Sequence, residues 1–245
     1  VAIVEDGRVR AAMEDETHHM EVTVNHDGRH VTGIEGTSHR IPWTTCPGAH
    51  AKIKELIGLP LQRMNRTTGR DAKEHCTHLF DLTRLAIARA AVSRSVQYDA
   101  TVPDRVDTRT QAELLRDGKP LITWNVTGNS VTGPKPYAGH NLVGAPQWPA
   151  GLDDDTIEAA LVLRRTMFVA MVRSPEAAEA RDGNLPDGAL AQMIKDEGRT
   201  GRCFTYKFPM FDDAKPNHTW INYAGRRDQL LVSFPGTRSI AAMAR

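Results

Sequence analysis

Short segments of alternating apolar and polar residues, separated by Asp-Gly pairs, open the chain. The Asp-Gly pairs stand at positions 6–7 and 27–28, and the segments that flank them are 2–4 with 9–11 and 20–24 with 31–35. Asp-Gly between alternating segments is the strongest short-range signal for a β-hairpin. The first 35 residues therefore predict antiparallel sheet.

The second hairpin brings a histidine and a carboxylate onto one surface. A two-residue turn would place Glu35 on the apolar face that His18 continues, and it would turn His19 to the opposite face beside Glu21. Desolvation on such a face shifts pKa values, which suits general acid/base chemistry. We expect His18 to act with Glu35, or with Asp15 as the group that orients its ring. The alternative is a core histidine bonded to a backbone carbonyl.

Apolar spacing further along the chain predicts three helices and another hairpin. The helices cover about 49–57, 72–91 and 156–173, and a weaker one covers 188–197. Pro47 suits a first helical turn, which puts Cys46 at a helix N-terminus. Residues 98–107 look extended, and 121–126 with 130–132 form a hairpin across a Gly-Asn turn. The polar stretch 175–201 is a candidate lid.

These elements predict an α+β fold. We expect a curled antiparallel sheet packed by two to four helices, in a core domain at residues 1–175. Residues 176–245 form a loop-rich extension that packs on the same core. Seven of the fourteen aromatic residues fall between positions 204 and 234, which indicates a hydrophobic pocket wall, a subunit contact or ordinary core.

Charge and cysteine usage narrow the class of partner. Thirty-one basic against 30 acidic residues give a net charge of +1, which offers no field for nucleic acid. The longest apolar run is broken by Arg164 and Arg165, so we expect no membrane span. Three widely spaced cysteines do not suggest a secreted disulfide framework, and we expect a cytoplasmic protein.

Familiar nucleotide, zincin and hydrolase motifs are absent from the sequence, so no cofactor is expected. Cys46 and Cys76 with His75 or His78 contain zinc-binding residue types, but their spacing fits no known finger. The alternatives are buried structural cysteines, or Cys46 as a nucleophile, since a helix N-terminus favours thiolate.

Several other residues suit a substrate site. Arg40 or Arg165 could grip a carboxylate, although Arg165 shares a helical stripe with Glu158 and an internal ion-pair network is the alternative. Tyr137 is a candidate acid. Aromatic residues predicted to line the pocket are Trp43, Phe208, Trp220 and Tyr223.

The order of the polar motifs resembles a bacterial family catalogued as a domain of unknown function. The resemblance rests on Glu14-Asp15 with His18, Arg40-x-Pro42-Trp43-x-x-Cys46-Pro47-x-Ala49, Cys76-Thr77-His78-Leu79 with Asp81, Arg116-Asp117-Gly118, Trp124, and Glu158-Ala159 with Arg164-Arg165. It extends from about residue 8 to 175 and implies a bacterial cytosolic protein. It supplies no mechanism, but members are commonest in bacteria that degrade aromatic compounds.

The first hypothesis is therefore a cofactor-independent lyase or isomerase that acts by proton transfer on a small aromatic, lignin-type substrate. The second is a ligand-binding or assembly module in which the aromatic tail closes a homodimer. The third is a Cys/His metal protein.

Overall fold

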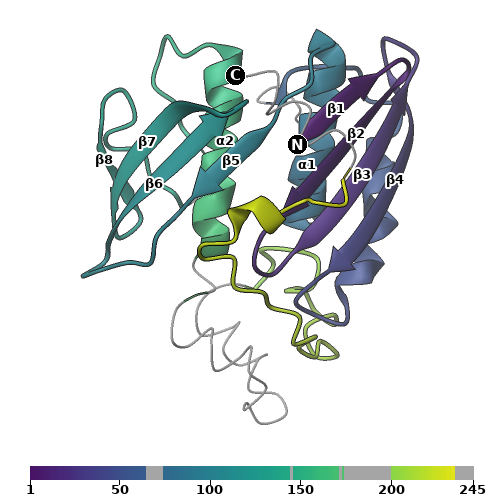
Figure 1. Cartoon of the computed structure of the whole chain (residues 1–245). Helices are drawn as coiled ribbons and strands as arrows, with labels where there is room; N and C mark the ends of the chain where they lie inside the picture. The colour runs from purple at the N-terminus through teal and green to yellow at the C-terminus, as the bar shows by residue number, and fades with distance from the viewer. Residues whose placement is uncertain (65–73, 144–145, 171–172, 174–199, 235–245) are drawn as a thin grey trace. The chain divides into compact units, whose positions relative to one another are not determined.

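The computed structural model describes residues 1–64, 74–143, 146–170, 173 and 200–234 (Figure 1). The chain divides into two compact units. The first contains described residues 1–64, 74–95 and 200–234, and the second contains 96–143, 146–170 and 173. The helix expected at 188–197 and nearly all of the candidate lid lie outside the described residues.

The first unit is built on a four-stranded antiparallel sheet in the order β1-β2-β3-β4. The strands are β1 (Ala2–Glu5), β2 (Arg8–Glu14), β3 (His19–His26) and β4 (Val31–Arg40). Glu5 pairs with Arg8 across the two-residue Asp6-Gly7 turn, so the first predicted hairpin is confirmed. Along β3, every second side chain is buried, which is the pattern of a sheet with one face in the core.

The second hairpin has a longer turn than expected. Asp27 accepts hydrogen bonds through Oδ1 from the backbone N–H groups of Arg29 and His30, at 2.8 and 2.7 Å, and this lengthens the turn. Val24 consequently pairs with Ile34, three positions beyond the predicted partner at position 31. An odd shift moves side chains to the other face. Glu35 is therefore exposed and does not share the face of His18, and the predicted register is wrong.

Helix α1 (Thr77–Val92) packs against β2 and β3 and covers the apolar face of this sheet (Figure 1). Its predicted apolar stripe is buried, including Leu79, Phe80, Leu82, Thr83, Ala86 and Ile87. The helix predicted at 49–57 consists instead of two 3-10 helices, η1 (Cys46–His50) and η2 (Lys52–Leu56). Ala49, Ile53 and Leu56 are buried as expected, whereas Ile57 is exposed.

Residues 200–234 belong to the first unit and are largely irregular, with one short 3-10 helix, η6 (Arg227–Gln229). Backbone hydrogen bonds tie this tail to the unit at several points. Asn217 donates to the carbonyl of Pro42, and Ile221 donates to the carbonyl of Glu16, both at 2.9 Å. The tail therefore reaches the turn between β2 and β3, where the candidate site lies.

The second unit has its own four-stranded antiparallel sheet, with strands in the order β5-β6-β7-β8. These are β5 (Tyr98–Thr101), β6 (Arg109–Arg116), β7 (Lys119–Thr127) and β8 (Ser130–Gly133). The predicted hairpin of β7 and β8 is confirmed, whereas β6 was not predicted. Helix α2 (Asp154–Ala170) packs on β5 and β6, and Asp153 Oδ1 accepts the Thr156 N–H at 2.7 Å at its start.

The α+β class is confirmed, with one difference in architecture. The described residues form two antiparallel sheets rather than one curled sheet, and the linear strand orders show that neither closes on itself. Among the described residues, no helix is both long and apolar enough to span a bilayer.

Candidate functional site

Asp15 and His18 lie in the turn between β2 and β3 and face each other. Oδ1 of Asp15 accepts the backbone N–H groups of Thr17 and His18, each at 2.7 Å, which fixes the carboxylate inside the turn. The His18 ring then places Nδ1 at 3.1 and 3.2 Å from the two carboxylate oxygens. Asp15 thus orients His18, and Glu35 does not.

The first turn of α1 adds a second imidazole. The rings of His18 and His78 lie against each other, with their centroids 3.9 Å apart and an interplanar angle of 30°. The position of His78 near the start of α1, which packs on β3, accounts for this contact. Burial raises the pKa of Asp15, but the charges and hydrogen bonds around it, first those of His18 and then those of His78, lower it to about 2.

This geometry suits proton transfer better than metal coordination. One ligand atom from each of Asp15, His18 and His78 lies within 4.8 Å of the others. Two imidazoles on one ion, with bonds of about 2.1 Å and N–metal–N angles of about 90–110°, hold their ring centroids about 4.5–5.3 Å apart. The rings of His18 and His78 are closer than that. Because the Asp15 carboxylate faces Nδ1 of His18, Nε2 of the same ring is the atom that can exchange a proton, as in other His–Asp pairs.

A buried ion pair supports the turn that carries this dyad. Arg40 Nη2 donates to Glu14 Oε1 at 3.0 Å and to the Asp15 carbonyl at 2.5 Å. The hydroxyl of Tyr223 donates to the same Glu14 oxygen at 2.6 Å, and the Leu231 N–H donates to Oε2 at 2.5 Å. Arg40 was expected to grip a substrate anion, but its described contacts are with the protein itself.

The same contacts set the charge state of this ion pair. Burial raises the pKa of the Glu14 carboxyl, whereas the hydrogen bonds from Tyr223 and Leu231 lower it more, so that the net direction is downward. Burial and the Glu14 hydrogen bond raise the pKa of the Tyr223 hydroxyl. Glu14 is therefore an anion and Tyr223 a neutral donor at neutral pH. Sequence reasoning missed this role of Glu14.

The other aromatic residues of the first unit are spread out. Trp43 packs against Phe211 and Tyr206, with a ring separation of 6.5 Å to Tyr206. Phe208 is 78% exposed and so is not part of a buried wall, while Trp220 is half-buried. Of the predicted pocket aromatics, Tyr223 reaches the Glu14–Arg40 pair that supports the dyad.

Tyr137 and Arg165 belong to the second unit. The Tyr137 ring lies edge-on to Trp124 with centroids 5.5 Å apart, and burial raises its pKa. The guanidinium of Arg165 lies 5.9 Å from the centroid of the Phe168 ring. Glu158 is buried and accepts a hydrogen bond from the Tyr98 hydroxyl at 2.8 Å. These contacts place both predicted residues in packing of that unit.

None of Cys46, Cys76 and Cys203 forms a disulfide bond. Burial raises the pKa of the Cys46 thiol, and burial raises that of Cys76 to about 12. Neither is an activated nucleophile, because the thiolate is the reactive form. Within the described part of the chain, no cysteine joins a cluster with metal-binding geometry.

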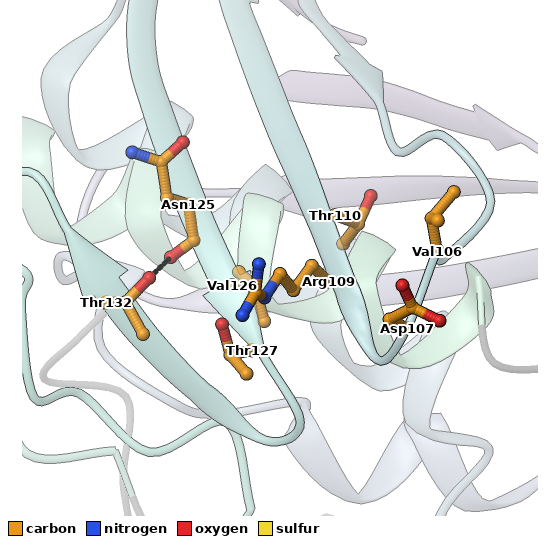
Figure 2. Close-up of a pocket in the computed structure, with 8 residues that line it drawn as sticks. All are labelled: Val106, Asp107, Arg109, Thr110, Asn125, Val126, Thr127 and Thr132. Carbon is orange, nitrogen blue, oxygen red and sulfur yellow. Dashed lines mark hydrogen bonds between the residues drawn. The ribbon is translucent and has the colours of Figure 1, made fainter.

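A shallow hollow lies on the second unit, where β6, β7 and β8 turn polar side chains outward (Figure 2). Its lining includes Arg109, Thr110 and Asn125, and the Thr132 hydroxyl donates to the Asn125 carbonyl at 3.1 Å. No predicted site residue lines it, and it contains no histidine or cysteine.

The turn, the start of α1 and the Arg40 motif all lie in one stretch of sequence. Residues 2–92 match a family model described as a protein of unknown function, DUF2889. That segment includes Asp15, His18, Arg40 and His78. The match confirms the resemblance to a domain of unknown function over residues 2–92. The motifs from Arg116 onward lie beyond it. No curated protein and no solved structure matches the chain.

Proposed function

We propose that this protein is a lyase or isomerase that works by general acid/base proton transfer on a small aromatic substrate, without a cofactor. The Asp15–His18 pair is the observation that carries the proposal. The His18 side chain keeps 9% of its surface exposed, so it is shielded from bulk water and still reachable. A positioned acid/base group of this kind contributes about 10²–10⁴-fold to a rate.

In the proposed reaction, Nε2 of His18 takes a proton from a substrate hydroxyl while Asp15 stabilises the imidazolium on Nδ1. The hydroxyl carbon becomes a carbonyl as its bond to the neighbouring carbon breaks, and the electron pair moves to the other fragment. That fragment is then protonated by the imidazolium, which restores His18. In an isomerase the proton returns to the same molecule.

The aromatic, lignin-derived substrate class is the finer part of the proposal. It is supported by the resemblance to a family common in bacteria that degrade aromatic compounds. Exposed and half-buried rings in the first unit, such as Trp43 and Tyr223, offer surfaces on which an aromatic substrate can stack.

The test is to incubate the full chain with a panel of lignin-derived phenols and to identify products by mass spectrometry. We expect product from the wild type and from the control His30→Gln, whose side chain is exposed on a turn. We expect His18→Gln and Asp15→Asn to lose about 100-fold or more while circular dichroism shows a retained fold. Equal turnover by His18→Gln would refute the assignment.

A homodimeric assembly module is the second candidate, favoured by Phe208. The Phe208 ring is 78% exposed beside Phe211 and offers an apolar surface on which a second copy of the chain can pack. If the tail closes a dimer, light scattering shows a dimer for the wild type and a monomer for Phe208→Ser. A wild-type monomer at high concentration excludes this candidate.

A further inference from the structure

The opposite side of β3 carries a second group of histidines. His19 and Glu21 alternate with buried residues and so face away from the core. His39 joins them from β4. Across the two strands His19 pairs with Arg40 and the next residue, Met20, pairs with Ser38. His39 has no partner in this pairing and is therefore the extra residue of a β-bulge. Bulges redirect a side chain in this way and are often found beside functional sites.

The three side chains converge on one point. Glu21 Oε1 lies 3.0 Å from His39 Nε2 and 3.8 Å from His19 Nε2. One ligand atom from each residue lies within 4.8 Å of the other two. Ligand atoms bound tetrahedrally to one ion at about 2.05 Å lie about 3.3 Å apart, so only small side-chain movements are needed.

The two imidazoles of this cluster lie further apart than those of His18 and His78. The rings of His19 and His39 have centroids 4.6 Å apart and an interplanar angle of 44°. That separation lies at the lower end of the range of about 4.5–5.3 Å that two imidazoles adopt on one ion with bonds of about 2.1 Å, near the value for an N–metal–N angle of about 90°. The rings are tilted against each other, so both Nε2 atoms can point to a common centre.

A second carboxylate stands behind His19. Glu14 Oε1 lies 3.8 Å from His19 Nδ1, on the side of the ring opposite to Glu21. Metal-binding histidines commonly face a carboxylate through the other ring nitrogen, which fixes the ring and strengthens the ligand. Arg40 and Tyr223 hold Glu14 in place, and the Arg40 charge near the cluster is balanced by Glu14.

We propose that His19, Glu21 and His39 bind a divalent first-row transition-metal ion. Two imidazoles and one carboxylate are the ligand set of several catalytic zinc sites, which leave a coordination position open. The side chains of Glu21 and His39 are 33% and 46% exposed, so the open positions face solvent and admit water or an anionic ligand. The site is independent of the Asp15–His18 pair, because it lies on the other face of β3.

The test is a titration of EDTA-treated full-length protein with Zn²⁺ by calorimetry, and with Co²⁺ by visible absorption. We expect one ion bound through this cluster, at least 10-fold weaker binding in His39→Gln and Glu21→Gln, and unchanged binding in the control His30→Gln. Visible bands of four- or five-coordinate Co²⁺ should disappear in His39→Gln while circular dichroism is unchanged.

Two outcomes overturn the proposal. One is the absence of Zn²⁺ binding by the wild type. The other is binding that persists in His39→Gln and is lost in His78→Gln, since that assigns the ion to Asp15, His18 and His78. Product formation by the acid/base route is measured separately and does not depend on either result.

Discussion

Replacing Asp15 by asparagine should remove a specific part of the pH dependence of stability. The pKa of this carboxyl falls from 3.8 to about 2 in the folded protein. At about 1.4 kcal/mol per pKa unit, the charged form contributes about 2 kcal/mol to folding. Because the folded pKa is lowered, this stability is present above the unfolded value and is lost as pH falls from about 5 to 2.

The assay is urea unfolding followed by circular dichroism at pH 5, 4, 3 and 2. The wild type should lose about 2 kcal/mol more than Asp15→Asn over this range, because asparagine does not titrate. The control Asp212→Asn, at an exposed position, should follow the wild-type curve. Parallel curves for the wild type and Asp15→Asn would show that the carboxylate is not held by His18.

Three further predictions concern the first unit. Arg40→Met should lower the free energy of unfolding by about 3–5 kcal/mol, because it leaves the Glu14 carboxylate buried without its cation. Urea unfolding should show that the double variant with Glu14→Gln regains part of this free energy. No gain in the double variant would contradict the ion pair. Cys76, with a pKa of about 12, should react with iodoacetamide at pH 8 far more slowly in the folded than in the urea-unfolded protein. Equal rates by mass spectrometry would show that the fold does not suppress the thiolate. Gly48→Ala should destabilise the fold by about 1–3 kcal/mol, because the new Cβ would lie 2.8 Å from the Phe204 ring. Thermal unfolding should show that adding Phe204→Leu reduces this destabilisation. An unchanged melting temperature for Gly48→Ala would mean that the tail does not pack against Gly48.

The parts of the fold that the sequence predicts correctly are those that depend on neighbouring residues alone. The Asp6-Gly7 turn needs only two residues, and the apolar stripe of α1 follows from helical spacing alone. The second hairpin fails because the Asp27 side chain bonds to two backbone N–H groups and lengthens the turn. Strand β6 was missed because its outward side chains are polar and its buried positions are few.

The candidate site was only partly accessible to the same reasoning. Asp15 and His18 are three positions apart, so a turn can bring them together, and the structure places their side chains in contact. The contact between His18 and His78 spans sixty residues and depends on how α1 packs on the sheet. The bulge that places His39 beside Glu21 has no sequence signature, because it follows from a slip in strand pairing.

In the proposed function, His18, held by Asp15, moves a proton to and from an aromatic substrate. The most direct measurement is the incorporation of deuterium from D₂O into substrate or product, followed by mass spectrometry for the wild type, His18→Gln and His30→Gln. We expect deuterium uptake with the wild type and the His30 variant, and a loss of about 100-fold or more with the His18 variant. Equal uptake by the folded His18→Gln protein would contradict it.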